Sequence, residues 1–315
     1  MPTRIIAIVG PTAVGKSAVA EHLALRLGGE IVSADSMQVY RGMDVGTAKT
    51  PPRERRCTHH CIDLVDPGVL YSAAVYQRDA RMAIGDILAR GAVPVIVGGT
   101  GLYVRAALDE MSFPAGDLDD SLRDDLERRA VAEGPEALFA ELARLDPDSA
   151  AIIHPNNVRR VVRALEMAAY GASYAEQAAG FGHRQSHYPE TIIVGLTMER
   201  SALYRRIDER VDVMLASGLL DEVRTLIGAG FRDALTATQA IGYKEFVGVL
   251  EEGAPLADAV EAVKRATRRY AKRQLTWFRA DPRVHWLDVT SLSSAAAGEA
   301  AVDLIESVGH TGGDS

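Results

Sequence analysis

Residues 10–17, GPTAVGKS, are the stretch whose residue types and spacing point most directly to chemistry. The spacing G-x-x-x-x-G-K-S is that of a phosphate-binding loop, in which backbone N–H groups hold anionic oxygens. The apolar run Ile5–Val9 precedes the loop and a helical pattern follows it, which is the strand–loop–helix context that the motif requires. We predict that a phosphate or diphosphate is bound by Gly10, Pro11, Thr12, Ala13, Val14, Gly15, Lys16 and Ser17. Lys16 would supply positive charge, and the Ser17 hydroxyl would bind Mg²⁺.

Asp35 is the acidic residue best placed to act on a group held by this loop. It ends the apolar segment 30–35 and begins the polar run DSMQVYRGMDVGTAK. A nucleotide hydrolase needs an aspartate at the end of a strand to hold its Mg²⁺, yet the strand at residues 93–97 runs into Gly98 and Gly99. Asp35 is therefore a candidate general base or metal ligand, and the residues alone leave both roles open.

Apolar runs and helical periods alternate over the first hundred residues, which is typical of an α/β fold. The pattern predicts strands at residues 4–9, 30–35, 93–97, 191–198 and 284–289, and helices at 17–27 and 72–90. The carboxyl ends of parallel strands line the ligand crevice of such a sheet. We therefore expect residues 10–17, 35–36 and 98–101 to meet at one site.

Residues 113–187 contain helical periods and nothing strand-like. The predicted fold class is therefore α/β, with a P-loop NTPase-like parallel-sheet core and a helical insertion domain. The predicted divisions are the first part of the core at 1–112, the helical insertion at 113–187, the second part of the core with a basic helix at 188–300, and a C-terminal tail at 301–315.

The composition favours a globular cytoplasmic protein with no membrane association. The chain has 315 residues, of which 47% are hydrophobic and 25% charged, and it contains neither a run of eighteen apolar residues nor a signal-peptide pattern. Cys57 and Cys61 bracket two histidines in CTHHCID, but four ligand types in five residues are too compressed for a structural zinc site. A loop with locally hydrogen-bonded histidines is the favoured interpretation.

Basic residues are concentrated in two helical patterns although the formal net charge is −8. Between residues 264 and 279 no acid occurs, and six cations spread over one half of a helix: Lys264, Arg265, Arg268, Arg269, Lys272 and Arg273. A second cluster in the insertion consists of Arg159, Arg160 and Arg163. We favour binding of a nucleic-acid backbone by these clusters over a merely solvated helix face.

In the helix at 203–215, Arg206 and Arg210 are four residues apart. They could either pair with neighbouring acids or close over a diphosphate, and their spacing does not decide between these two roles.

The chain resembles the bacterial tRNA dimethylallyltransferases, also called tRNA isopentenyltransferases, over nearly its whole length. The resemblance rests on motifs that occur in the family's order: GPTAVGKS, DSMQVYRGMDVGTAK, HHCIDLVDP, VGGTGLY, NNVRRVVRALE, RIDERVDVML, QAIGYKE and AKRQLTWFR. It implies transfer of a dimethylallyl group from dimethylallyl diphosphate to N6 of adenosine 37 in tRNAs that read codons beginning with U. The phosphate-binding loop would then hold the diphosphate of the prenyl donor, and whether ATP binds at all stays open.

The resemblance also implies roles for the residues noted above. Asp35 would accept the N6 proton, Thr100 would orient the reacting groups, and Lys16, with Arg206 or Arg210 and Mg²⁺, would stabilise the leaving diphosphate. We expect a monomer that binds the anticodon stem-loop through its helical insertion. The residues expected to contact tRNA are Asp35, Ser36, Met37, Gln38, Thr100, Arg123, Arg159, Arg160, Val161, Val162, Arg163, Gln239, Gly242, Tyr243, Lys244, Lys272, Arg273, Gln274, Trp277 and Arg279.

The sequence departs from the family pattern beside the paired histidines, where Cys57-Thr58 and Cys61 stand in place of apolar residues and a proline.

Three other functions remain as alternatives. A small-molecule P-loop kinase would leave the insertion and the basic helix unexplained. An isopentenyltransferase acting on free adenine nucleotides would not need the cationic helix, and a non-catalytic RNA-binding module would have no use for Lys16 and Asp35.

Overall fold

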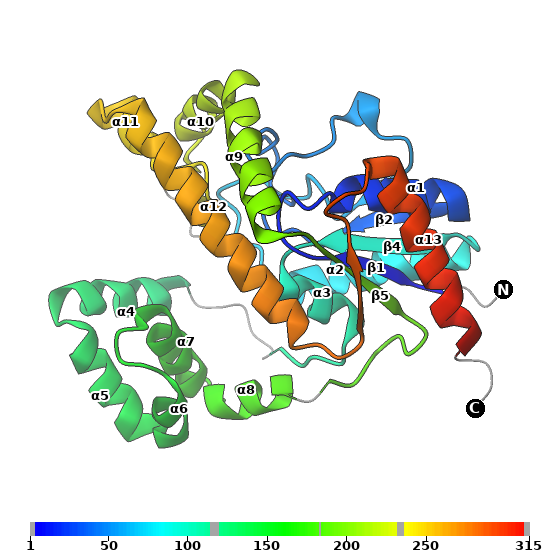
Figure 1. Ribbon diagram of the computed structural model, residues 1–315. Coiled ribbons are helices and arrows are strands. Elements are labelled where there is room, and N and C mark those ends of the chain that lie inside the picture. Colours follow the sequence, from blue (N-terminus) through cyan, green and yellow to red (C-terminus); the bar gives the residue numbers. More distant parts are fainter. Residues whose placement is uncertain (1–3, 114–119, 183, 232–235, 312–315) are drawn as a thin grey trace. The chain divides into compact units, whose positions relative to one another are not determined.

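The computed structural model describes residues 4–113, 120–182, 184–231 and 236–311 (Figure 1). The chain forms two compact units, one made of residues 1–108 and 188–315 and the other of residues 109–187. We call them the sheet unit and the helical unit. The helical unit begins before residue 113, where the sequence predicted the insertion to begin, and ends at the predicted residue 187.

The sheet unit is built on six parallel strands in the order β3-β2-β4-β1-β5-β6. All four residues of β1 are buried, as expected for a central strand that has helices on both faces. The predicted α/β fold class is confirmed, and the short edge strand β3 is the one that the sequence pattern did not predict. The strands are β1 (Ile6–Val9), β2 (Gly29–Ser33), β3 (His59–His60), β4 (Val93–Gly98), β5 (Ile192–Thr197) and β6 (Val284–Asp288).

Helices cover both faces of this sheet (Figure 1). The chain moves along the sheet from β1 to β2 through α1 and returns in the opposite direction from β3 to β4 through α2, so right-handed connections place α1 and α2 on opposite faces. α13 packs beside α1, α3 packs beside α2, and α12 packs against α9 and α3. The helices are α1 (Lys16–Leu27), α2 (Ala73–Ala89), α3 (Gly101–Leu108), α9 (Arg200–Ala216), α10 (Leu219–Gly228), α11 (Lys244–Glu252), α12 (Leu256–Arg279) and α13 (Ser294–Thr311), with the short turns η1 (Pro52–Glu54) and η3 (Ala237–Gln239). No helix in the described ranges combines the length and apolarity of a membrane span.

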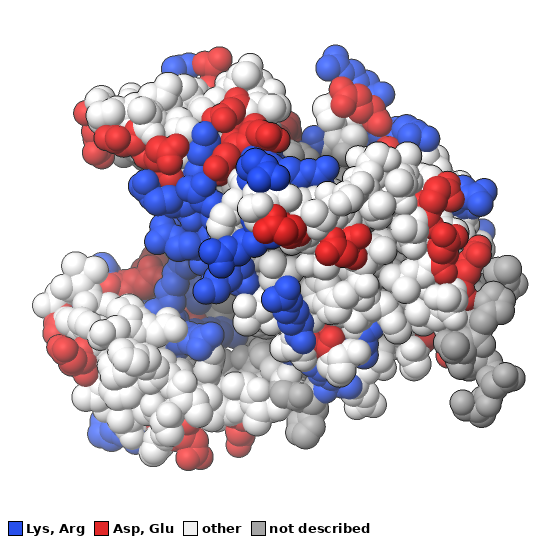
Figure 2. Space-filling view, viewed as in Figure 1, with Lys and Arg blue, Asp and Glu red and all other residues white. Residues whose placement is uncertain are grey.

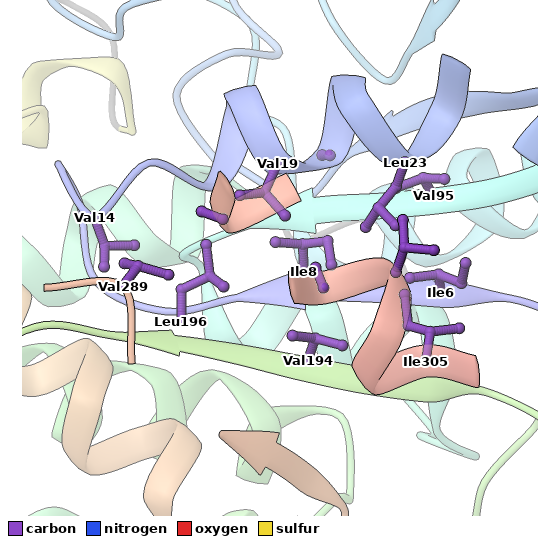
Figure 3. Packing of buried hydrophobic residues seen from close by; sticks show 14 of the residues in the cluster. Ile6, Ile8, Val14, Val19, Leu23, Val95, Val194, Leu196, Val289 and Ile305 are labelled. Carbon is purple, nitrogen blue, oxygen red and sulfur yellow. The ribbon is translucent and has the colours of Figure 1, made fainter. Parts of the chain in front are cut away.

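An apolar cluster lies between the sheet and the α1–α13 pair (Figure 3). Ile6, Ile8 and Val194 contribute from the strands, Leu23 from α1 and Ile305 from α13. The cluster reaches the carboxyl ends of the strands, where Val14 of the phosphate-binding loop is 1% exposed. The loop is therefore anchored to the core by a buried side chain.

The prediction of a C-terminal tail at 301–315 is corrected, because helix α13 continues through this segment to Thr311. Ala301, Val302 and Ile305 are buried in the core cluster, because α13 has an apolar face that covers the sheet beside α1. Residues 312–315 of the predicted tail lie outside the described residues.

We expect Ile305→Ala to lower the free energy of unfolding by about 2–5 kcal/mol, because it removes buried methyl groups and leaves a cavity. Urea unfolding measures the change. Asp303→Ala, at an exposed position of the same helix, is the control and should have little effect. Equal, small effects of the two substitutions would indicate that α13 does not contribute to the core.

The helical unit has its own apolar core, formed by residues such as Leu138, Leu142, Val161 and Leu165. Two of its helices begin at side-chain caps: the Asp146 carboxylate accepts from the Ser149 N–H, and the Asn157 side chain accepts from the Arg160 N–H. Its helices are α4 (Asp120–Ala132), α5 (Pro135–Leu145), α6 (Pro147–Ile152), α7 (Val158–Ala169) and α8 (Tyr174–Gly182).

Candidate functional site

Three loops that follow neighbouring strands form the candidate site. The loop after β1 is the phosphate-binding loop, the turn after β2 contains Asp35, and the turn after β4 contains Thr100. Since β2, β4 and β1 are adjacent and parallel, their carboxyl ends share one edge of the sheet. The Thr100 N–H donates to the Ala34 carbonyl at 3.2 Å, and the Ser36 N–H donates to the Thr100 hydroxyl at 3.1 Å. The turns after β2 and β4 are thus directly joined.

The phosphate-binding loop has a positive φ angle, which favours glycine, at three positions: two are glycines and the third is Ala13, with a φ angle of 66°. Gly10 and Gly15 have φ angles of 140° and 106°. A Cβ atom at Gly10 would also lie 2.5 Å from the Leu196 carbonyl oxygen of β5, so this part of the loop runs close against the sheet. The Lys16 Nζ reaches back over the loop and donates to the Pro11 carbonyl at 2.7 Å.

Lys16, Arg210 and Asp35 are close enough to perturb one another electrostatically. Burial and the positive charge of Arg210 both lower the pKa of the Lys16 ammonium, and the carboxylate of Asp35 opposes them, so that the pKa is about 7. Burial also lowers the pKa of Arg210, against the effect of Asp35. Arg206, one turn earlier on α9, is exposed and lines a small pocket with Gly15. The structure therefore distinguishes the two arginines, which their spacing in the sequence did not: Arg210 is close to Lys16 and Asp35 and is largely removed from solvent, whereas Arg206 is exposed.

We expect binding of an organic diphosphate at pH 8 to take up close to one proton. A lysine of pKa about 7 is mostly neutral at this pH, and the bound anion restores its charge by raising that pKa again. Affinity should accordingly fall as the pH rises above about 7, by up to tenfold per unit. Isothermal titration in buffers of different ionisation enthalpy measures the uptake. Lys16→Met is the control, and the same uptake in that variant would contradict the assignment to Lys16.

Close packing explains the glycines of VGGTG. A Cβ atom at Gly98 would lie 2.1 Å from the Ala34 carbonyl oxygen, and one at Gly99 would lie 2.0 Å from the Gln274 amide nitrogen. At Gly101 it would lie 2.1 Å from the Trp277 ring. The turn after β4 therefore has no room for side chains where β2 and α12 approach it.

Tyr270 is a site residue that sequence reasoning placed on the packing half of α12 and did not assign to the site. Its hydroxyl interacts with the side chains of Thr100 and Gln274, and burial together with the charge of Asp35 raises its pKa to about 12. Tyr270 and Gln274 are four residues apart and so share one face of the helix. The four-residue spacing could have indicated that Tyr270 lies beside Gln274. It could not indicate which residues this face of α12 contacts.

Glu222 of α10 holds the segment that follows Asp35. Its carboxylate accepts from the backbone N–H groups of Asp44, Val45 and Gly46 at 2.9, 2.7 and 3.0 Å. It also accepts from the Tyr243 hydroxyl at 2.6 Å. This carboxylate thus fixes the polar run whose first residues form the turn at Asp35.

Four side chains predicted to contact tRNA are buried within their own units. Val161 and Val162 belong to the core of the helical unit, because α7 turns these positions inward. Tyr243 is 0% exposed, and both ends of the Gln274 amide are bonded inside the sheet unit. Gly242 is also buried, and its N–H donates to Glu245 at 2.9 Å.

The other predicted tRNA contacts differ in how accessible they are. Arg123 makes two hydrogen bonds to the buried Glu166 at 2.7 and 2.9 Å, and Gln38 is bonded to Ser33 and to the Thr47 carbonyl. Ser36, Met37, Thr100 and Arg163 are partly exposed. Other predicted contacts have exposed side chains: Arg159, Arg160, Gln239, Lys244, Lys272, Arg273, Trp277 and Arg279.

Exposed cations form a stripe along α12, which we call the cationic stripe: Arg265, Arg269, Lys272, Arg273 and Arg279. At 100° per residue they share one side of the helix, and Figure 2 shows Lys and Arg gathered in the region of α12. Among the described residues, no acid forms an ion pair with a member of the stripe. Lys264 and Arg268 do not belong to it, since they pair with Asp212 and Asp208 of α9 at 2.7 and 2.8 Å.

Of the histidines and cysteines of CTHHCID, His60 has a hydrogen-bond partner and Cys61 is buried, whereas Cys57 is half-buried and the buried Nε2 of His59 has no partner among the described residues. His60 bonds to Glu30 at 2.6 Å, and burial raises the pKa of the Cys61 thiol to about 12. Within the described ranges, no group of three or more His, Cys, Asp or Glu side chains is arranged to hold a metal ion.

Comparison with known proteins gives consistent matches over most of the chain. The profile of the IPP transferase family matches residues 38–281, and that of the isopentenyl transferases matches residues 3–70. A tRNA dimethylallyltransferase of Geobacillus thermodenitrificans is 51% identical over 292 residues, which is 92% of each chain. One from Geobacillus kaustophilus is 48% identical over 94% of each chain.

Solved structures also match. The full-length tRNA isopentenylpyrophosphate transferase of Bacillus halodurans has a TM-score of 0.69 at 42% identity, with 97% of both chains covered. A eukaryotic dimethylallyltransferase acting on tRNA has a TM-score of 0.80 at 32% identity, over 97% of this chain and 80% of that one.

Proposed function

This chain belongs to the IPP transferase family, and we propose that it transfers a dimethylallyl group from dimethylallyl diphosphate to tRNA. We place the acceptor at N6 of adenosine 37, in tRNAs that read codons beginning with U. The observation that carries this proposal is the convergence of three charged side chains at one edge of the sheet: Lys16 at the loop after β1, Asp35 in the turn after β2, and Arg210 of α9. In this proposal the two cations stabilise the leaving diphosphate, and the carboxylate takes the proton.

The reaction breaks the allylic C1–O bond of the donor and forms a bond from C1 to N6. The phosphate-binding loop, Lys16 and Arg210 stabilise the negative charge that accumulates on the departing diphosphate. Asp35 accepts the proton that N6 loses, and Thr100 orients the turn on which Asp35 stands through its bond to the Ser36 N–H. The adenine must leave the stacked anticodon loop to reach this site, as bases do in other enzymes that modify them.

Mg²⁺ fits the donor set at the loop. The Ser17 hydroxyl is exposed at the start of α1, and Mg²⁺ typically takes one or two protein oxygens together with phosphate oxygens and water. Ser17 would hold the ion, which when bound neutralises charge on the diphosphate.

The cationic stripe is the surface proposed to bind the RNA backbone in the sheet unit, with Arg159, Arg160 and Arg163 as the corresponding cluster in the helical unit. Phosphate contacts of this kind release counterions, so affinity falls with salt in proportion to their number. Bases of the anticodon loop would rest on aromatic and guanidinium planes, for which Trp277 is exposed on the same helix.

We expect the double variant Lys272→Ala, Arg273→Ala to bind an anticodon stem-loop more weakly and to reduce the slope of log affinity against log salt by about 1–2. Filter binding between low and moderate salt measures the slope. Lys264→Ala, Arg268→Ala removes the same charge from the same helix, but at ion-paired positions, and should change the slope less. Equal slopes for the wild type and the Lys272, Arg273 variant would exclude these contacts.

The function is tested by a transfer assay with Mg²⁺, labelled dimethylallyl diphosphate and an unmodified tRNA carrying adenosine 37, with AMP and ATP in parallel reactions. Label on N6 of that adenosine, with none on AMP and no ATP consumed, is the expected result. Label on AMP would indicate a free-nucleotide isopentenyltransferase, and ATP consumption without prenyl transfer would indicate a kinase. RNA binding with neither prenyl transfer nor ATP consumption would indicate a non-catalytic RNA-binding protein.

A further inference from the structure

The side chain of Gln274 joins two loops of the candidate site. It is 5% exposed, its Oε1 accepts from the Thr12 N–H at 2.8 Å, and its Nε2 donates to the Gly99 carbonyl at 2.9 Å. One end therefore holds the phosphate-binding loop, and the other holds the turn that carries Thr100. A neutral amide suits both ends, because it presents an acceptor and a donor on one rigid plane.

The surroundings of Gln274 are built around this contact. Gly99 leaves the space that the amide occupies, since a Cβ atom there would lie 2.0 Å from Nε2. Tyr270, one helical turn earlier, interacts with both Thr100 and Gln274. The same helix thus contacts the loop proposed to hold the leaving group and the turn proposed to orient the acceptor.

We propose that Gln274 is a positioning residue that fixes the spacing between the diphosphate site and the Thr100–Asp35 turns. This inference rests on the proposed function, because it supposes transfer from one of these loops to the other. In-line displacement needs the reacting atoms at a defined separation, and a displacement of about 1 Å can slow an enzyme about 10²-fold. Gln274 itself touches neither substrate in this role.

Gln274→Met tests the proposal, because it keeps the length and volume of the side chain and removes both hydrogen bonds. We expect kcat for the stem-loop to fall about 10–100-fold, while KM for the RNA stays within about three-fold of wild type. Gly99→Ala should act on the same contact by displacing the amide. The double variant should then be no slower than the slower single variant, since both substitutions remove one interaction.

The matched control is Thr267→Val, which removes a hydrogen bond within α12, from the Thr267 hydroxyl to the Val263 carbonyl at 2.8 Å, and should leave kcat near wild type. Amide hydrogen exchange at Thr12, followed by NMR without substrates, gives an independent readout. Protection at Thr12 should fall in Gln274→Met and persist in Thr267→Val.

A kcat for Gln274→Met within two-fold of wild type, or a Thr12 amide that stays fully protected, would overturn the proposal. A lower melting temperature with unchanged kcat would also overturn it, by showing that Gln274 serves packing alone. If wild type transfers no prenyl group, the proposed function fails, and the exchange at Thr12 alone then decides whether Gln274 holds the loop.

Discussion

Replacing Asp35 with Asn lowers the rate of prenyl transfer by an expected 10²–10⁴-fold, roughly the contribution of a positioned general base, while the affinity for the stem-loop stays near wild type. The structure makes Asn the informative substitution. Asp35 Oδ1 accepts from the Met37 N–H at 2.9 Å, and the amide oxygen of Asn can accept the same bond. The turn is thereby kept, and only the ability to take a proton is removed.

Single-turnover transfer with saturating donor measures this effect, because product release cannot then mask the chemical step. Asp66→Asn is the control, since Asp66 is an exposed carboxylate of the sheet unit that pairs with Arg41. Transfer by Asp35→Asn within about five-fold of wild type would remove Asp35 from the mechanism. Loss of RNA binding together with transfer would instead assign Asp35 to substrate binding.

Arg210→Ala has the second large expected effect, a loss of about 10²–10³-fold in kcat, because it removes a cation from the developing charge on the diphosphate. Arg206→Ala is the matched control, one helical turn away on α9. Its side chain is exposed and should contribute less than about five-fold. Steady-state kinetics with both variants compares two arginines that the sequence could not distinguish.

The Arg210 prediction has a second readout that does not depend on turnover. The charge of Arg210 helps to lower the pKa of Lys16, so its removal should raise that pKa and leave Lys16 more protonated before the diphosphate binds. The proton uptake on binding at pH 8 should therefore decrease in Arg210→Ala and stay unchanged in Arg206→Ala. Equal kinetic losses in the two variants, with equal uptake, would contradict the assignment.

The sequence by itself determined the elements of the sheet and the edge at which the site lies. β1 and β4 are buried apolar runs that end in glycine turns, and such local patterns fix a strand and its end without tertiary information. The order of motifs also determined the family, and with it Lys16, Asp35 and Thr100 as candidates. β3 escaped prediction because its two histidines form a strand only by pairing with β2 at the edge.

Only the tertiary structure decided what each face of a helix contacts. Helical spacing placed six cations on one half of α12, but α9 lies beside that helix and neutralises Lys264 and Arg268. The same spacing could not show that α13 completes the core or that Val161 and Val162 of α7 are buried. Periodicity gives the side of a helix on which a residue stands, and not the neighbour that covers it.

The roles of Gln274 and Arg210 were decided in the same way. Thr12 and Gln274 are 262 residues apart in the chain and 2.8 Å apart at their bonded atoms. Arg210 comes close to Lys16 and Asp35 because α9 is packed against α12, whereas Arg206 is exposed and lines a small pocket with Gly15. Local chemistry fixes which groups can bind or move a proton, and the packing of distant elements fixes which of them do so together.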